Sequence, residues 1–276
     1  MLPSGGMGDG SAPEMSKDCS MANGVERRRE EIVTLVQARG YVSIEDLAAA
    51  FAVTPQTMRR DINALSDQAL LRRYHGGAGL PSSVENIAYP ARKVLCHDEK
   101  KRIARLVARH IPDHASLFLN IGTTTEEVAR ALQDRKGLRV ITNNLNIALM
   151  LSRRNDFEVI VAGGVVRSRD GGIIGASAVD LIHQFKVDCG VIGISGIDLD
   201  GTLLDFDYRE VRVAQSIVAN SRKVFLVADH TKFGRNAMIR LGPLSMIDAL
   251  FTDRPPPEPL AKLCAEAEVA LHVAEA

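Results

Sequence analysis

VTPQTMRRDIN, residues 53–63, is the stretch of sequence that decides how the first part of this chain folds. Thr54 is a favourable N-cap and the proline after it suits the first position of a helix, so we predict that a helix starts here. Met58, Ile62 and Leu65 fall at helical spacing and predict one buried face. The polar residues include Gln, Asn and Arg, which can bond base edges bidentately. The stretch therefore indicates a DNA recognition helix or, as the alternative, an ordinary surface helix.

A second short helix is predicted immediately before this one. The sequence SIED at 43–46 resembles a capping box with Asp in place of the usual Glu or Gln. A longer helix is predicted over 30–39. Two short helices joined by a tight turn predict a helix-turn-helix. After them, 70–74 is typical of a strand and 75–77 of a turn, which together predict a wing.

Beyond residue 98, apolar runs and amphipathic stretches alternate along the chain. Helices are predicted at 100–110, 125–132, 145–153, 176–185, 209–221 and 260–267. Strands are predicted at 117–121, 138–142, 157–162, 187–194, 224–228 and 249–252. The strands are short and rich in Val, Ile and Leu, as in a parallel sheet that is buried on both faces. Alternation of this kind predicts an α/β domain with a mainly parallel sheet.

The composition is that of an ordinary soluble protein. Hydrophobic residues make up 46% of the chain, which is enough for a core, yet no apolar run approaches the ~18 residues of a membrane span. The formal net charge is zero, so affinity for DNA phosphates must come from where the arginines sit. The four cysteines show neither CxxC spacing nor clustering with His, so we expect reduced thiols in a cytoplasmic protein and no metal site.

Composition also divides the chain. We expect a disordered tail at 1–23, a DNA-binding domain at 24–78, a linker at 79–97 and an effector-binding domain at 98–276. The tail is rich in Gly, Ser and Met and shows no periodicity. The far end of the linker is basic, from Arg92 to Arg102. That basic run predicts either a solvated helix start or a cationic rim over a phosphate site.

Three predicted strands end in small or polar residues: GTTT at 122–125, two asparagines at 143–144 and two glycines at 163–164. The carboxyl ends of parallel strands are where α/β sheets bind ligands. Glycine lets a ligand approach the backbone, and free N–H groups at a helix start attract anions. We therefore predict a phosphate cradle, with an ordinary strand–helix turn as the alternative.

Charged residues elsewhere could complete such a site. Arg167 and Lys232 are candidate cations for a phosphate, and Asp229 is a candidate partner for a hydroxyl; for each, the alternative is an ordinary surface residue. Nucleotide cofactors are not expected, because the sequence has no GxxxxGK[ST] and no GxGxxG after a strand. The sequence IDLDGTLL at 197–204 matches the DxDGT signature of haloacid-dehalogenase-type phosphatases, but its late position in the chain argues against that chemistry.

Several motifs in one order resemble a known family. Those at 41–43, 55–61 and 73–78 resemble the amino-terminal domain of DeoR-family bacterial repressors, and those at 120–124, 141–146, 162–164, 167–175, 193–198 and 229–238 resemble its sensor domain. The resemblance runs from about Arg27 to the C-terminus. It implies an α+β winged helix-turn-helix followed by an α/β sensor domain similar to sugar-phosphate isomerases. It also implies double-stranded operator DNA and a phosphorylated metabolite as ligands, and a homo-oligomer, dimer or tetramer, as the working form.

The motifs are most similar to family members that control glycerol metabolism, which implies glycerol 3-phosphate as the effector that releases the repressor from DNA. Another sugar phosphate is the alternative. An enzymatic sugar-phosphate isomerase is a further hypothesis, by fold analogy only. It would need a general base, and Asp205, Glu210, His183 and His230 are available without a motif that assigns one.

The expected contacts follow from these motifs. For DNA they are Ser43, Thr54, Gln56, Thr57, Arg59, Arg60, Asn63, Arg73 and His75. For the effector they are Gly122, Thr123, Thr124, Thr125, Asn143, Asn144, Gly163, Gly164, Arg167, Asp229 and Lys232. No catalytic residue, cofactor or metal is expected.

Overall fold

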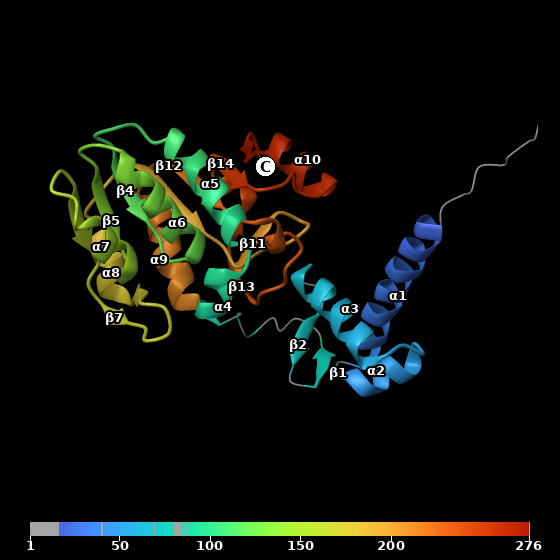
Figure 1. Cartoon of the computed structure of the whole chain (residues 1–276). Helices are drawn as coiled ribbons and strands as arrows, with labels where there is room; N and C mark the ends of the chain where they lie inside the picture. The colour runs from blue at the N-terminus through green and yellow to red at the C-terminus, as the bar shows by residue number, and fades with distance from the viewer. Residues whose placement is uncertain are drawn as a thin grey trace, which may run out of the picture. The chain divides into compact units, whose positions relative to one another are not determined.

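The computed structural model describes residues 17–39, 41–68, 70–74, 76–79, 84, 86 and 88–275; for residues 17–23, 37, 38, 41, 74 and 91 it describes only the backbone. Contacts divide the chain between Pro81 and Ser82 into two compact units (Figure 1). Each unit has a hydrophobic core of its own. The boundary lies inside the segment that the sequence predicts as a linker.

The N-terminal unit is a winged helix-turn-helix. Its elements are α1 (Lys17–Arg39), β1 (Tyr41–Ser43), α2 (Ile44–Ala50), α3 (Pro55–Asp67), β2 (Arg72–Tyr74) and β3 (Gly77–Gly79). The strands form an antiparallel sheet in the order β1-β3-β2, with Ala78 opposite both Val42 and Arg73. Ile32 of α1 and Met58 of α3 are completely buried together with side chains of α2. The predicted helix-turn-helix and wing strand are therefore confirmed.

Both predicted helix starts are built as the sequence indicates. The Ser43 hydroxyl accepts a 3.0 Å hydrogen bond from the backbone N–H of Asp46, which caps α2. The Thr54 hydroxyl accepts a 3.2 Å hydrogen bond from the N–H of Thr57, and Pro55 occupies the first position of α3. Each cap satisfies an N–H group that has no intrahelical acceptor.

Helix α1 is longer than predicted. It starts at Lys17, so residues 17–23 are helical and the prediction that the tail extends to residue 23 is wrong for them. Those seven residues contain neither Gly nor Pro, and Gly24, which follows them, lies inside α1 without ending it. Residues 1–16 of the predicted tail lie outside the described residues.

The C-terminal unit is an α/β domain, as predicted. Among the described residues, seven parallel strands form its sheet, in the order β15 (Ala270–Val273), β14 (Ala249–Thr252), β12 (Ser221–Val227), β9 (Val187–Gly193), β4 (Ser116–Leu119), β5 (Arg139–Thr142) and β6 (Glu158–Val161). The main helices around it are α5 (His97–Arg109), α6 (Thr123–Ala131), α7 (Leu145–Leu151), α8 (Ala176–Ile182), α9 (Tyr208–Ala219) and α10 (Glu258–Glu266).

Helices cover both faces of this sheet (Figure 1). Successive side chains of a strand point to opposite faces. Leu117 and Leu119 of β4 accordingly pack in one cluster with α5, α6 and α7, whereas Phe118 packs in a second cluster with α8, α9 and α10. Because both faces are buried, the strands consist of nearly continuous apolar runs, and this is why they are readable in the sequence.

The strand order creates a switch point at the centre of the sheet. From β4 the chain proceeds outward through β5 to β6, and it then returns to β9 on the other side of β4. The connections that leave the carboxyl ends of β4 and β9 therefore diverge. In open α/β sheets the crevice at such a point is where ligands bind.

Several elements were not predicted. A short ribbon pairs β7 (Val165–Val166) with β8 (Ile173–Ile174), and β10 (Gly196–Ile197), β11 (Thr202–Asp205) and β13 (Ile239–Pro243) form a small antiparallel sheet. Helix α4 (Tyr89–Val94) lies in the expected linker but packs against α6, so the linker ends before residue 97. None of the helices in the described part of the chain combines the length and apolar character that a bilayer span requires.

Candidate DNA-binding surface and effector pocket

Helix α3 separates an apolar face from a polar one. Met58, Ile62 and Leu65 are buried in the core of the N-terminal unit. The predicted DNA contacts Gln56, Arg59, Arg60 and Asn63 are all exposed. Such a helix can keep its core contacts while its polar face enters a DNA groove.

The other predicted DNA contacts have varied surroundings. Arg73 of the wing strand is exposed and donates a 3.1 Å hydrogen bond to the side-chain oxygen of Asn63, which links the wing to α3. The hydroxyls of Ser43 and Thr54 already cap helices, and the hydroxyl of Thr57 lies 3.0 Å from that of Thr54. His75 lies outside the described residues.

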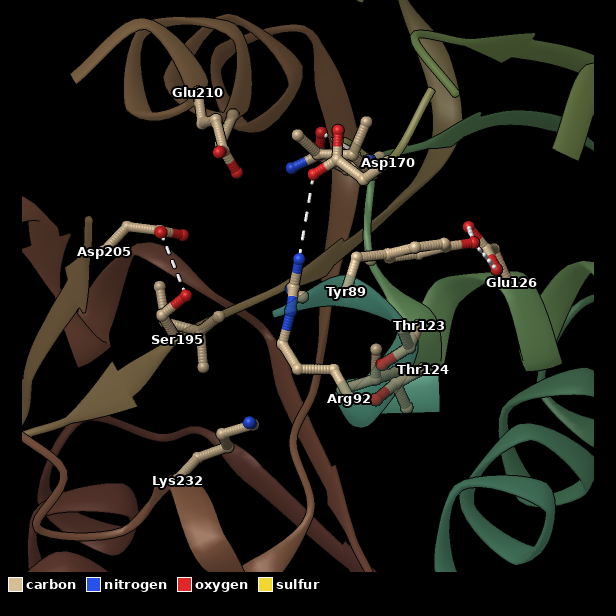
Figure 2. A pocket seen from close by; sticks show the side chains of 17 residues that line it. Tyr89, Arg92, Thr123, Thr124, Glu126, Asp170, Ser195, Asp205, Glu210 and Lys232 are labelled. Carbon is tan, nitrogen blue, oxygen red and sulfur yellow. Dashed lines mark hydrogen bonds and ion pairs between the residues drawn. The ribbon is translucent and has the colours of Figure 1, made fainter. Parts of the chain in front are cut away.

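A pocket lies at the switch point of the C-terminal unit (Figure 2). It is formed by the segments that follow β4 and β9, by the end of β12, and by helix α4. Its lining residues are Tyr89, Arg92, Asn120, Ile121, Gly122, Thr123, Thr124, Glu126, Asp170, Gly193, Ile194, Ser195, Asp205, Glu210, Ala214, Val227 and Lys232.

One end of the pocket is the start of α6. Gly122 is its N-cap residue, with a φ of 149°, a backbone conformation that glycine adopts without strain. The first N–H groups of a helix have no intrahelical acceptor, and the hydroxyls of Thr123 and Thr124 stand beside them. This arrangement of donors is suited to an anion.

Lys232 faces the pocket from the short 3-10 helix His230–Lys232. Burial lowers the pKa of Lys232 to about 8, against the opposing effect of Asp229. Burial alone would favour the neutral acid at Asp229, yet Lys232 and Thr231 hold the pKa of Asp229 below its usual value. The ammonium of Lys232 and the carboxylate of Asp229, which is not among the lining residues of the pocket, therefore each stabilise the charged form of the other.

Arg92 enters the pocket from α4. Figure 2 shows its side chain extending across the middle of the pocket toward Asp170, and the two groups lie 3.7 Å apart. The Nε atom of Arg92 is buried and has no hydrogen-bond partner among the described residues. Arg92 is thus a second cation at the site, and it belongs to the basic run that the sequence offered as a cationic rim.

Carboxylates gather at the opposite end. Asp170, Asp205 and Glu210 line the pocket, and the hydroxyl of Ser195 donates a 2.9 Å hydrogen bond to Asp205. Burial raises the pKa of Asp205. Carboxylate oxygens accept hydrogen bonds from hydroxyl groups, so this end of the pocket can bind a polyol.

Glu126 joins several pocket elements. The phenol of Tyr89 donates to its carboxylate at 2.9 Å, and the side-chain amides of Asn144 and Asn146 donate to it at 3.1 and 3.0 Å. The side chain is buried, yet each of these bonds satisfies it. Helices α4, α6 and α7 are in this way tied together at the pocket wall.

Some of the residues predicted to bind the effector line the pocket and others do not. Gly122, Thr123, Thr124 and Lys232 line it; Thr125, Asn143, Asn144, Gly163, Gly164, Arg167 and Asp229 are not among its lining residues. Asn144 caps α7, and the hydroxyl of Thr125 donates to the carbonyl of Gly122. A side chain at Gly164 would meet the carbonyl of Ile174 at 2.7 Å, so this glycine serves the close approach of two strands.

Arg167 pairs with carboxylates beside the pocket. It lies 2.7 Å from Asp170 and 3.4 Å from Asp207, and it also pairs with Glu210. A guanidinium held by three acids has little capacity left for a ligand anion. The sequence pattern assigned Arg167 to the effector and Arg92 only to a possible cationic rim, because two of the acidic partners of Arg167, Asp207 and Glu210, lie about 40 residues further along the chain.

Comparisons with known proteins agree with this architecture. Residues 28–84 match the DeoR-like helix-turn-helix domain and residues 95–254 match the DeoR C terminal sensor domain. The chain is 52% identical over 247 residues to the glycerol-3-phosphate regulon repressor of Escherichia coli, which covers 90% of this chain and 98% of that protein. It is 43% identical over 242 residues to the HTH-type transcriptional repressor CsqR of the same organism, over 88% of this chain and 93% of that protein.

A solved structure, ribose 5-phosphate isomerase A from Methanocaldococcus jannaschii, is 11% identical with a TM-score of 0.38, over 51% of this chain and 56% of that one. A TM-score this low supports no conclusion about function. The two domain matches cover both compact units, and the 52% identity extends across nearly the whole of a curated relative. The chain therefore belongs to the DeoR family.

Proposed function

We propose that this chain is a DNA-binding transcriptional repressor of glycerol-metabolism genes and that glycerol 3-phosphate releases it from its operator. The observation that carries the proposal is the composition of the pocket, which offers anion-binding groups at one end and carboxylates at the other. The 52% identity to a glycerol-3-phosphate regulon repressor supports the choice of effector.

In this proposal the phosphate binds at the start of α6. Backbone N–H groups and the hydroxyls of Thr123 and Thr124 donate to its oxygens, and Lys232 and Arg92 supply positive charge. The dipole of α6 adds to the attraction, because the N-terminus of a helix carries a partial positive charge. A ligand without a phosphate leaves these donors and cations without an acceptor.

The triol backbone of the ligand binds at the acidic end. Its hydroxyl groups donate to Asp170, Asp205 or Glu210. Inorganic phosphate bound at the start of α6 has no such extension toward these carboxylates. Both halves of the ligand are therefore needed, and this is the basis of selectivity in the proposal. Another sugar phosphate is the alternative effector, since longer polyols carry the same two chemical groups.

The DNA contacts come from the exposed face of α3. We propose that it enters the major groove of a palindromic operator, with Arg59 and Arg60 contacting bases or phosphates and Arg73 of the wing contacting the backbone. Palindromes are read by symmetric assemblies, so a homo-oligomer is the proposed working form. Because a repressor must reach its operator DNA, the cytoplasm is the proposed location.

We propose that the pocket senses its ligand and does not turn it over. Asp198 and Asp200 of the phosphatase-like DxDGT stretch are exposed in the turn between β10 and β11 and are not among the lining residues of the pocket. Asp198 accepts a hydrogen bond from the N–H of Leu199, and Asp200 accepts one from the N–H of Thr202. These carboxylates shape a turn.

The test is operator affinity of the full chain, titrated with glycerol 3-phosphate, glycerol, inorganic phosphate and several sugar phosphates. The operator is a duplex obtained by in vitro selection from random sequences with this protein. We expect only glycerol 3-phosphate to weaken binding strongly, by a factor between about 5 and 150, which is typical of coupled sites. Release by glycerol alone would overturn the proposal, as would consumption of the ligand by the purified protein.

A further inference from the structure

Helix α4 places an arginine in the centre of the effector pocket. The Arg92 side chain crosses the pocket between the α6 start and Asp170, as Figure 2 shows. A ligand that spans the anion end and the acidic end must contact Arg92 or displace it from Asp170. Ligand binding and the position of Arg92 are therefore physically linked.

The ends of α4 are held by buried polar contacts. At its start, Tyr89 donates to Glu126 of α6. At its end, the ammonium of Lys100 donates to the backbone carbonyls of Arg92 and Leu95, which are among the carbonyls that a helix terminus leaves without partners. Lys100 is 2% exposed, so its charge is committed to these contacts. Lys100 is not among the lining residues of the pocket.

The same helix is close in sequence to the DNA-binding unit. That unit ends at Pro81, and only residues 82–88 lie between it and Tyr89. Helix α4 is therefore the pocket element that directly continues the segment joining the two units, in which Asn86 bonds Ser195 and Arg235. Lys232, the other cation of the pocket, lies about 140 residues further along the chain, and its segment reaches residues 82–88 through Arg235, which donates a 2.9 Å hydrogen bond to Asn86.

We propose that α4 is the element through which the bound effector acts on the DNA-binding unit, with Arg92 as its ligand-contacting residue and Lys100 as its positioning residue. This inference rests on the proposed function. Coupling requires a protein element whose position differs between the ligand-bound and the DNA-bound states. Contact with the ligand draws Arg92 away from Asp170 and moves α4, whereas Lys232 contributes affinity only.

The experiment separates affinity from coupling. For the full chain and each variant, operator affinity is measured without effector and at saturating glycerol 3-phosphate, and the coupling is the ratio of the two dissociation constants. Effector binding to the DNA-free protein is measured by calorimetry to set the saturating concentration. The variants are Arg92→Gln, Lys232→Met and Lys100→Met, and Lys101→Gln on the exposed side of α5 is the matched control for Lys100→Met.

We expect Lys232→Met to need more effector but to reach the coupling of the parent at saturation. For Arg92→Gln, the ratio of the two dissociation constants is expected to fall to one fifth of the parent's ratio or less, even at saturation. Lys100→Met is expected to bind effector and yet lose coupling, while Lys101→Gln behaves as the parent. If Lys100→Met fails to fold, the contrast between Arg92→Gln and Lys232→Met decides alone.

Two failures are distinguishable. If the parent chain does not respond to glycerol 3-phosphate or to any sugar phosphate, the proposed function is wrong. If the parent responds and Arg92→Gln retains its coupling at saturation, or loses it no more than Lys232→Met does, α4 is not the coupling element and the proposed function stands.

Discussion

The carboxylate of Asp61 on α3 accepts a 2.8 Å hydrogen bond from Nε of Arg28 on α1. Asp61 is 2% exposed, while Arg59 and Arg60, which directly precede it, point to solvent. Arg29 donates to the second oxygen of the same carboxylate at 3.1 Å. These three consecutive charged residues thus have two different roles. Asp61 holds α3 against α1, and Arg59 and Arg60 remain exposed on α3.

The first prediction concerns this carboxylate. Asp61→Ala should lower the free energy of unfolding of the N-terminal unit by about 1–3 kcal/mol, because it leaves two partly buried guanidinium groups without their acceptor. Urea denaturation followed by circular dichroism would measure the change. Asp67→Ala, at the exposed end of the same helix, is the control and should be near neutral. Equal stability of the two variants would show that the contact between α1 and α3 does not depend on Asp61.

The second prediction concerns DNA. Arg59→Ala and Arg60→Ala should each weaken operator binding. An arginine that reads a base should cost ~1–3 kcal/mol and relax specificity at one position, whereas one that contacts phosphate should weaken all sequences alike and reduce the salt slope by about one. Anisotropy titrations at several salt concentrations would tell these apart. Lys262→Ala, an exposed cation of the other unit, is the control. Parental affinity in both arginine variants would exclude this face of α3 from the interface.

The third prediction is a pH dependence. Because the pKa of Lys232 is lowered to about 8, its ammonium is largely charged at pH 7 and largely neutral at pH 9. A phosphomonoester is already a dianion above its second pKa of about 6. Effector affinity should therefore fall as the pH rises from 7 to 9, with the midpoint moved upward by the bound dianion. Calorimetry on the parent and on Lys232→Met would check it; the same pH slope in both would assign the loss to another group.

The fourth prediction uses two neighbouring threonines. Thr124→Val removes a hydroxyl that lines the pocket, so effector affinity should fall by roughly 2- to 10-fold, the range of one hydrogen bond. Thr125→Val has the same chemistry, but the Thr125 hydroxyl donates to the Gly122 carbonyl at 2.8 Å and does not line the pocket. It should affect melting temperature more than affinity. The reverse result would mean that the donors at the start of α6 are misassigned.

Local signals made the helix-turn-helix and the parallel sheet predictable. The Thr54 cap and the spacing of Met58 and Ile62 lie within a few residues of each other, and the strands are continuous apolar runs. Helix α4 has no such signal. It is held by Glu126, which is distant in sequence, and by Lys100, which belongs to α5. Its existence depends on tertiary contacts that a single sequence does not display.

The pocket was only half predictable for the same reason. Glycine and threonine after a strand are a local pattern, so Gly122 to Thr124 were found. Ser195 and Asp205 meet because β10 and β11 form a hairpin, and two of the three acidic partners of Arg167 come from a segment some 40 residues away. Pairing between distant segments depends on register and loop path, which decide whether a charge faces a ligand or an acid.

The anion end that we propose for the pocket combines backbone N–H groups at the start of α6 with side chains, whereas the acidic end is built from side chains alone. In evolutionary terms the two ends are not equally open to change. A substitution that preserves the strand–helix junction at Gly122 leaves these backbone donors in place. The carboxylates opposite it can be exchanged one at a time. Under the proposed function, a lineage with this sensor can come to respond to a different phosphorylated metabolite by point mutation at the acidic end, while the backbone donors for phosphate are inherited with the fold.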